Sequence, residues 1–323
     1  MTKYVVSGYI GFDNFGDEAI AKILVSYLKS TDAEKITYIS SNPQKTSQTL
    51  EVTSVRMLDF VKPILESDVL ISGGGSLLQD ITSLKSLIYY LVVILTALLF
   101  GKKVVIFAQG FTPFRTKLGK FFTKLILKYC DKISVRDFQS QEYLWTMGIS
   151  SKLVSDPVFA LEIPHQEKKE IGIQLRNNSY LTDSFLNKLA KEIAQNFPDK
   201  EIKLISLQDN LDLEVLNKFK NILEEAGVKS IIIKNLGVNE AVQTISSLEY
   251  LIAMRFHACL IGVKANVKTL GINYDIKVEK LSQETGFPIL NFEENDMINK
   301  FNELKKLNPH NYHIPTFKFE DII

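Results

Sequence analysis

The sequence has little cysteine, histidine or net charge, and each shortage excludes a class of protein. Its two cysteines, Cys130 and Cys259, have no CxxC partner, which excludes a zinc knuckle and a disulfide framework. Its four histidines are too scattered to predict a metal site. Lys plus Arg total 38 against 37 Asp plus Glu, a net charge of +1 without the basic excess of nucleic-acid-binding domains. We therefore predict no metal and no nucleic-acid partner.

Long hydrophobic runs are also missing. The longest, Leu87–Phe100, covers 14 residues, whereas a membrane-spanning helix needs about 20. The first residues run directly into an expected strand at Tyr4–Ser7, with no charged and then apolar signal segment before it. With the low cysteine content, this predicts a cytoplasmic protein.

Short β-branched segments alternate with longer helical ones, which is typical of parallel sheets covered on both faces. In the first half we expect strands and helices at Tyr4–Ser7, 18–29 (helix), Ile36–Ser40, Val69–Ser72, 84–100 (helix), Val104–Ala108 and Lys132–Val135. After a charged linker at 161–170 the alternation restarts, at Ile171–Leu175, 183–196 (helix), Ile202–Ser206, 211–226 (helix), Ser230–Ile233, 238–247 (helix), Tyr250–Ala253, 257–264 (helix) and Val267–Gly271, with a last helix at 295–306 and an irregular tail.

This pattern predicts an α/β fold of two Rossmann-like, doubly wound domains facing a cleft, residues 1–162 and 163–323. Ligands of such sheets bind at the carboxyl ends of the strands. The motifs at those ends therefore carry the functional prediction.

A glycine-containing loop follows the first strand and opens the first helix. Gly8, Gly11 and Gly16 let the backbone approach a ligand, but the spacing is neither GxGxxG nor that of a phosphate-binding P-loop. Asp17 and Glu18 at the helix start argue against a bound pyrophosphate. They are either N-terminal caps, or Asp17 binds sugar hydroxyls.

A second loop places Gly73, Gly74 and Gly75 at a strand end. Three consecutive glycines cost backbone entropy, so we expect a ligand against bare main chain, whose N–H groups can form an anion nest. The alternative is a plain tight turn.

Four cations stand just after predicted strands. Arg255 and His257 flank a strand-to-helix turn, while Arg136, Arg176 and Lys277 follow other strands. A histidine in a first helical turn is disfavoured as imidazolium unless an anion sits beside it, and a lone histidine is often structural. Arg136 could equally form a surface salt bridge with its neighbour. Taken together, the cations predict a small substrate that carries phosphate and carboxylate.

With these motifs in view, the sequence resembles the polysaccharide pyruvyl transferase family, particularly its bacterial cell-wall polymer branch. The matching segments occur in order, at GYIGFDNFGDEAI (8–20), ISGGGSLLQD (71–80), AQGFTP (108–113), SVRDFQS (134–140), SDPVF (155–159), IGIQLR (171–176), MRFHACLIG (254–262) and GINYDIKV (271–278).

The resemblance implies two domains arranged as in GT-B glycosyltransferases. It also implies transfer of the enolpyruvyl unit of phosphoenolpyruvate to a sugar of a surface polysaccharide precursor, giving a pyruvate ketal and phosphate without a cofactor or catalytic metal. His257 matches the family's histidine, and we expect it to act as general acid. Arg136 and Lys277 match family positions, and with Arg255 they are expected to bind the donor. The expected acceptor or cleft-lining residues are Asp17, Gly73, Gly74, Gly75, Gln109 and Arg176.

The acceptor in this branch is a carbohydrate, often on a lipid carrier. From Ile81 to Cys130 the sequence has no acidic residue and eight Lys or Arg, and residues 115–129 form a basic amphipathic pattern. This predicts peripheral contact with the inner face of the membrane. The alternative is a solvated charged face on a helix packed against its own sheet.

Two other functions remain open from the sequence. A GT-B glycosyltransferase using a nucleotide sugar would need a grip on the ribose, for which Glu249 is a candidate. A non-catalytic sugar-binding relative is the second. A nicotinamide-dependent dehydrogenase is disfavoured because no GxGxxG follows a strand. Nothing in the sequence indicates the oligomeric state.

Overall fold

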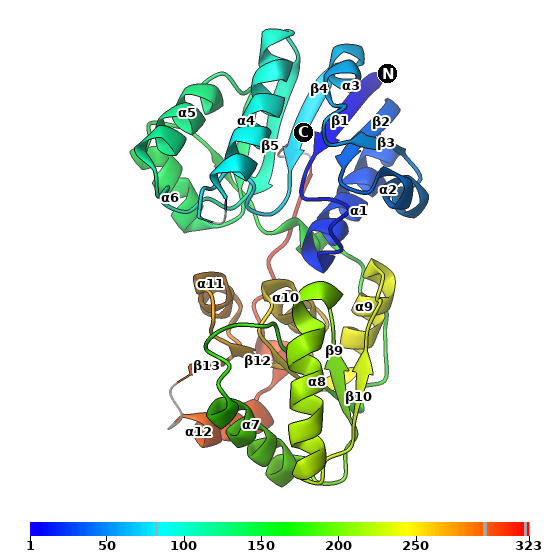
Figure 1. The fold of residues 1–323 in the computed structure, drawn as a ribbon, viewed down its shortest axis with the longest axis vertical. Coiled ribbons are helices and arrows are strands. Elements are labelled where there is room, and N and C mark those ends of the chain that lie inside the picture. Colours follow the sequence, from blue (N-terminus) through cyan, green and yellow to red (C-terminus); the bar gives the residue numbers. More distant parts are fainter. Residues whose placement is uncertain (82, 293–295, 320–321, 323) are drawn as a thin grey trace. The chain divides into compact units, whose positions relative to one another are not determined.

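The computed structural model describes residues 1–323 except 82, 293–295, 320–321 and 323. The chain divides into two compact units (Figure 1). The first contains Met1–Leu161 and Thr316–Ile323, and the second contains Glu162–Pro315. The start of the last predicted helix, at 295, lies outside the described residues.

The first unit is built on a parallel sheet of seven strands in the order β3-β2-β1-β4-β5-β6-β7. The strands are β1 (Thr2–Ser7), β2 (Ala33–Ser40), β3 (Thr53–Arg56), β4 (Val69–Gly73), β5 (Lys103–Gln109), β6 (Lys132–Val135) and β7 (Lys152–Leu153). The helices are α1 (Phe15–Ser30), α2 (Pro43–Leu50), α3 (Val61–Glu66), α4 (Leu84–Leu99), α5 (Lys117–Leu127) and α6 (Phe138–Thr146).

The second unit repeats this arrangement with six parallel strands in the order β10-β9-β8-β11-β12-β13. The strands are β8 (Glu170–Gln174), β9 (Ile202–Ile205), β10 (Ser230–Ile233), β11 (Leu248–Ala253), β12 (Lys268–Ile272) and β13 (Ile289–Leu290). The helices are α7 (Asp183–Asn196), α8 (Asp209–Glu225), α9 (Val238–Ser246), α10 (Phe256–Lys264), α11 (Ile276–Thr285) and α12 (Met297–Lys306).

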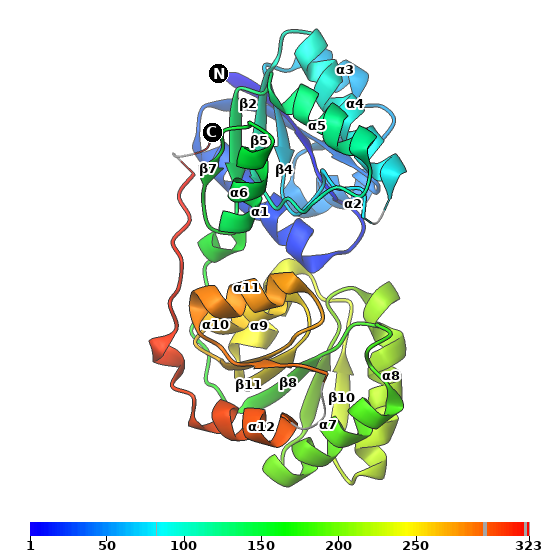
Figure 2. The ribbon, with the colours of Figure 1, turned by 90° about the vertical axis from the view of Figure 1, so that its left-hand side faces the viewer.

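Helices cover both faces of each sheet (Figures 1 and 2), which explains why the strands are apolar on both sides. Leu70 and Ile106 in the first sheet, and Ile173 and Ile252 in the second, are completely buried. In each unit the chain winds outward from its first strand and then returns to the opposite side. The switch points lie between β1 and β4 and between β8 and β11. Doubly wound sheets bind their ligands at the carboxyl ends of such strands.

The C-terminal segment differs from the sequence expectation, which assigned it to the second domain. Residues 316–323 group with the first unit. The rings of Phe317 and Phe319 lie against Phe107, each with a centroid separation of 5.9 Å, and Phe319 stacks on Tyr27 at 4.0 Å. Burial of these rings, worth a large apolar area each, holds the segment there.

Candidate active site

Two glycines lie close together at the switch point of the first sheet. Gly8 follows β1 and Gly73 ends the neighbouring β4. A Cβ atom on Gly8 would lie 2.9 Å from the carbonyl oxygen of Gly73, so no side chain fits there. The backbone is therefore bare at the position where doubly wound sheets bind ligands.

The next two glycines are required by the close approach of α1. Gly74 and Gly75 have φ angles of +85° and +67°. A Cβ on Gly74 would lie 2.9 Å from Ile20, and one on Gly75 would lie 2.5 Å from Oδ1 of Asp17. The packing of α1 on this loop therefore requires both glycines. The N–H of Gly74 donates to the carbonyl of Phe107 at 3.2 Å, so this group is already used and does not serve the predicted anion nest.

The start of α1 shows that the acidic pair are not its caps. Asn14 is the N-cap, with its side chain accepting from the N–H of Gly16 at 3.2 Å. Glu18 instead accepts from the N–H of Gly11 at 2.8 Å and fixes the loop after β1. Burial raises the pKa of Glu18 above its ordinary value, although the Gly11 hydrogen bond opposes this. Asp17, half-buried, faces Gly75.

Gln109 ends β5 after an irregularity in the strand. The register with β6 shifts between Ile106 and Gln109, and Ala108 adopts a left-handed φ of +45°. Such a bulge re-aims the next side chain. Gln109 is completely buried, and its Nε2 donates to the carbonyl and hydroxyl oxygens of Ser72, both at 3.0 Å. Among the described residues its Oε1 has no hydrogen-bond partner, which leaves a buried acceptor at this edge of the sheet.

Arg136 joins this group from the end of β6. It is 8% exposed, and its Nη1 lies 2.7 Å from Oδ2 of Asp156. Its Nη2 donates to the hydroxyl of Ser76 at 3.4 Å, and its Nε lies 3.1 Å from where a Cβ of Gly110 would be. The structure thus places Arg136 beside the glycine loop in a buried ion pair with Asp156.

In the second unit, Arg255 forms a buried, forked ion pair. It is 7% exposed, and Asp212 is completely buried. Nε donates to both carboxylate oxygens of Asp212 at 3.1 and 3.0 Å, and Nη2 donates to Oδ1 at 2.6 Å. Asp212 also accepts from the N–H groups of Leu207 and Gln208. This geometry fixes the plane of the guanidinium at the end of β11.

Two further residues connect Arg255 to the neighbouring strands. Its N–H donates to Oε1 of Gln174, the last residue of β8, at 2.8 Å. Tyr274, which follows β12, is mostly buried; burial raises its pKa, and the positive charges of Arg176 and Arg255 oppose that rise. Tyr274 also hydrogen-bonds Arg176. Arg176, Arg255 and Tyr274 therefore form one cluster at the switch point of the second sheet.

His257 and Lys277 occupy equivalent places on two adjacent helices. His257 is the second residue of α10, and Lys277 is the second residue of α11. Both are half-buried. Asp275 caps α11 by accepting from the N–H of Lys277 at 3.0 Å. Both side chains therefore start from helix N-termini at the carboxyl edge of the second sheet, where the helix dipole favours an anion.

The predicted residues thus form one group in each unit. Asp17, Gly73, Gly74, Gly75, Gln109 and Arg136 belong to the first, and Arg176, Arg255, His257 and Lys277 to the second. Sequence reasoning missed Asp156, Gln174 and Tyr274 as partners, although the matching segments contain them. Asp212 gave no signal at all, because its partner lies 43 residues away.

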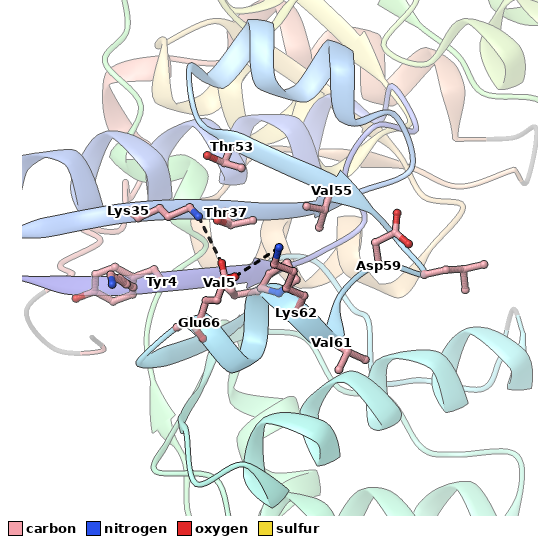
Figure 3. A pocket seen from close by; sticks show the side chains of 14 residues that line it. Tyr4, Val5, Lys35, Thr37, Thr53, Val55, Asp59, Val61, Lys62 and Glu66 are labelled. Carbon is pink, nitrogen blue, oxygen red and sulfur yellow. Dashed lines mark ion pairs between the residues drawn. The ribbon is translucent and has the colours of Figure 1, made fainter.

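A cavity of about 510 Å³ lies elsewhere in the first unit (Figure 3). Lys3, Lys35 and Thr53, near the amino ends of β1, β2 and β3, help to line it. Lys35 and Lys62 both pair with Glu66 at its wall, each at 3.8 Å. None of the predicted site residues lines this cavity, and it is at the opposite strand ends from the glycine loops. We therefore do not assign the active site to it.

In the described part of the chain, no group of three or more His, Cys, Asp or Glu side chains could hold a metal ion. Nor does any helix among the described residues have the length and apolar character needed to span a membrane.

Several solved structures share this fold, among them UDP-GlcNAc 2-epimerases. The UDP-GlcNAc 2-epimerase of Methanocaldococcus jannaschii superimposes with a TM-score of 0.68 at 11% identity, covering 98% of this chain and 96% of that one. The Neisseria meningitidis UDP-GlcNAc 2-epimerase bound to UDP-GlcNAc gives 0.64 at 10% identity, with coverages of 98% and 94%. MurG of Acinetobacter baumannii gives 0.54 at 11%, with coverages of 96% and 92%. These similarities confirm the predicted α/β, GT-B-like fold.

The family follows from the sequence itself. The family model of polysaccharide pyruvyl transferase matches residues 14–276, most of the chain. The protein therefore belongs to the polysaccharide pyruvyl transferase family and is a transferase, as its motifs indicate. No curated protein matches the chain significantly.

Proposed function

We propose that this transferase moves the enolpyruvyl unit of phosphoenolpyruvate onto a sugar of a cell-surface polysaccharide precursor, forming a cyclic pyruvate ketal and releasing phosphate. The proposal deepens the family assignment. The observation that carries it is the position of His257 in the first turn of α10. Arg255, the N-cap of this helix, belongs to the cluster with Arg176 and Tyr274. An imidazole at that place would meet the anionic donor that the cations would bind.

Donor binding is assigned to Arg255 and Lys277 of the second unit, and Arg136, in the first unit, stays a predicted donor-binding residue. Asp212 would act as a positioning residue, because it holds Nε and Nη2 of Arg255 and thereby sets the direction of the remaining N–H groups. Lys277, at the N-terminus of α11, would add a mobile ammonium group to the helix dipole. A phosphate and a carboxylate on one small molecule would satisfy Arg255 and Lys277 together.

The reaction would begin with transfer of a proton from His257 to the methylene carbon of the donor. The resulting oxocarbenium-like carbon would be attacked by a sugar hydroxyl, whose proton returns to the imidazole. Breaking of the carbon–oxygen bond to phosphate and attack by a second hydroxyl would then close the ketal. One hydroxyl proton thus ends in the new methyl group and the other on phosphate. Asp17, half-buried and facing Gly75, is the proposed residue for binding acceptor hydroxyls, whereas Gln109 is completely buried.

His257→Ala tests the acid role. General acid catalysis contributes about 10²- to 10⁴-fold, so we expect kcat to fall by about that factor while phosphoenolpyruvate still binds in calorimetry. His310→Ala is the matched control, because His310 is exposed in the C-terminal region of the second unit. Turnover of His257→Ala at the control's rate would remove His257 from catalysis.

The donor is tested by calorimetric titration of the full chain with phosphoenolpyruvate and with nucleotide sugars. Lys277→Ala should weaken phosphoenolpyruvate binding about 10- to 100-fold, the range for a hydrogen bond to a charged group. Lys280→Ala, one turn later on α11, serves as the control. Binding of a nucleotide sugar without phosphoenolpyruvate would instead support the glycosyltransferase.

The alternative function, a glycosyltransferase using a nucleotide sugar, would need Glu249 to bind the ribose. Glu249 is the second residue of β11, at the amino end of the strand. It lies six residues before Arg255, roughly 20 Å away along an extended chain. Doubly wound sheets bind ligands at the other end, so Glu249 is badly placed to hold a ribose.

A further inference from the structure

Half of the large apolar side chains that the described structure exposes come from one short region. They belong to α4, α5 and the residues next to them: Ile81, Leu84, Ile88, Val92, Leu95, Leu99, Phe100, Leu118, Phe121, Phe122, Leu125 and Tyr129. The two helices pack against each other. We call this set the α4–α5 surface. Soluble proteins rarely leave so much contiguous apolar surface open unless something binds to it.

On α4 these residues form one stripe. Leu84, Ile88, Val92, Leu95 and Leu99 are each between 41% and 76% exposed. At 3.6 residues per turn their directions fall within an arc of about 80°. The opposite side of the helix, including Leu87, Val93 and Ile94, is buried. The helix is therefore apolar on its packed face and on its open face.

Helix α5 has three distinct sides. Gly119, Thr123, Ile126 and Leu127 form the buried side. The large apolar residues form a second side that is open, with Leu118 at 69% and Phe121 at 58% exposure. The lysines of the helix lie between these two sides on the helical wheel. The helix therefore packs through a smaller face than its large apolar side, and its lysines lie outside that packed face.

The charged residues of the segment that forms this surface have one sign. Residues 81–130 contain eight Lys or Arg and no Asp or Glu. Lys117, Lys120 and Lys128 on α5 are exposed, as is Lys85 at the start of α4. A second copy of the chain docked face to face here would set lysine against lysine, which costs energy. An anionic, apolar partner would satisfy both features of the surface.

We propose that the α4–α5 surface binds the chain peripherally to a bilayer containing anionic lipid. The apolar stripe would enter the acyl boundary and the lysines would meet lipid phosphates, as in interfacial helices. This inference does not depend on the proposed reaction.

Hydrogen bonds to Asp80 connect the α4–α5 surface with the glycine loop. Asp80, near the end of the segment that contains Gly73, Gly74 and Gly75, holds the start of α5. Its carboxylate accepts from the N–H of Arg115 at 2.7 Å and from the N–H and hydroxyl of Thr116 at 2.8 and 2.6 Å. A chain held by this surface would therefore keep its glycine loop at a fixed place relative to the lipid.

Flotation of the full chain with lipid vesicles tests the proposal. We expect binding to phosphatidylcholine vesicles that contain phosphatidylglycerol, little binding to phosphatidylcholine alone, and release by salt. Trp145, the only tryptophan and 78% exposed, gives a second readout through energy transfer to a dansyl-labelled lipid.

Two surface variants separate the apolar from the charged contribution. Leu118→Ser with Phe121→Ser should lower the partition coefficient at least about tenfold. Lys117→Gln with Lys128→Gln should lower it about fivefold for each lysine, about 1 kcal/mol each. Leu58→Ser with Ile298→Ser is the matched control, since these side chains are 83% and 62% exposed and lie outside the surface.

The proposal is overturned if the wild-type chain fails to float with anionic vesicles, or if the control loses as much binding as the α5 variants. It is also overturned if light scattering finds a dimer that Leu118→Ser with Phe121→Ser dissociates and no vesicle binding occurs. Turnover of a water-soluble acceptor by the α5 variants should stay at the wild-type rate, so a failure here is distinct from a failure of the proposed reaction.

Discussion

At the scale of single residues, the candidate site depends on positions where no other side chain fits. Gly75 has two constraints, a left-handed φ of +67° and the carboxylate of Asp17 at 2.5 Å from an added Cβ. Gly101 has almost the same φ, +66°, with nothing within 4 Å. The two positions therefore separate backbone strain from crowding.

Gly75→Ala should consequently cost more than Gly101→Ala. The left-handed conformation costs alanine about 1–2 kcal/mol, which is all we expect for Gly101→Ala. Crowding against Asp17 should add about 1–3 kcal/mol for Gly75→Ala. Urea unfolding measures both. Equal losses in the two variants would mean that the Asp17 carboxylate turns away from the loop without cost.

Glu18 gives a pH dependence at the same loop. Its pKa is raised in the folded state, mainly by burial. A raised carboxyl pKa means that folding favours the protonated form, so this group's contribution to stability is present at low pH and is lost as the pH rises through the folded pKa. Glu18→Gln keeps an acceptor for the Gly11 N–H without the charge. It should be more stable than wild type at pH 7, and the difference should vanish toward pH 4. A constant difference across this range would contradict the assignment.

The carboxylate partners of the two buried arginines could not be predicted from the sequence. Arg136 and Arg255 could be placed at strand ends because β-branched segments mark the strands. Their partners could not be predicted, because Asp156 and Asp212 are 20 and 43 residues away. Only the packing of whole elements brings such pairs together. The glycines, in contrast, could be predicted from the sequence. Three consecutive glycines cost folding entropy, so a local structural or functional requirement was expected at that position.

At the scale of elements, long periodic segments were predictable and short ones were not. The predicted helix at 183–196 and strand at 132–135 match α7 and β6 residue for residue. The sequence pattern did not predict α2, β3, α3, α6, β7, α11 or β13, which have two to ten residues. For α5 the helix was foreseen, but which of its faces is buried was not. Gly119, Thr123, Ile126 and Leu127 make that contact, and the two small residues weaken its hydrophobicity pattern.

Asp80 permits a prediction about α5 as an element. Burial raises the pKa of Asp80, but the Thr116 hydroxyl and the N–H groups of Arg115 and Thr116 outweigh it, and the net pKa is lowered. Asp80→Ala removes all of these bonds and should cost about 2–3 kcal/mol, with faster amide exchange across 117–127. Asp59→Ala, at an exposed carboxylate of the same unit, should stay within about 0.5 kcal/mol. Unchanged exchange in α5 would show that the helix holds itself without Asp80.

At the scale of the whole molecule, the domain count and sheet class could be predicted because the same alternation of strand and helix occurs twice. The path of the last residues could not. The chain leaves the first unit near residue 161, builds the second, and returns with Thr316–Ile323. Nothing local marks this return, since Phe317 and Phe319 sit in an irregular segment. Their partners, Phe107 and Tyr27, are more than 200 residues away.

The C-terminal segment 316–323 should therefore stabilise the first unit and not the second. Phe317 is 8% exposed against Phe107, and Phe317→Ala should cost about 2–4 kcal/mol, with amide exchange rising in β5 and α1 but not in the strands of the second unit. Ile314→Ala is the control, because Ile314 is 36% exposed and belongs to the second unit. Faster exchange in β8 and β11 would show that the aromatic contact stabilises both units as one cooperative body. Amide exchange that rises only in the first unit would establish that the two sheets are independently stable and that the C-terminal segment stabilises the first unit alone.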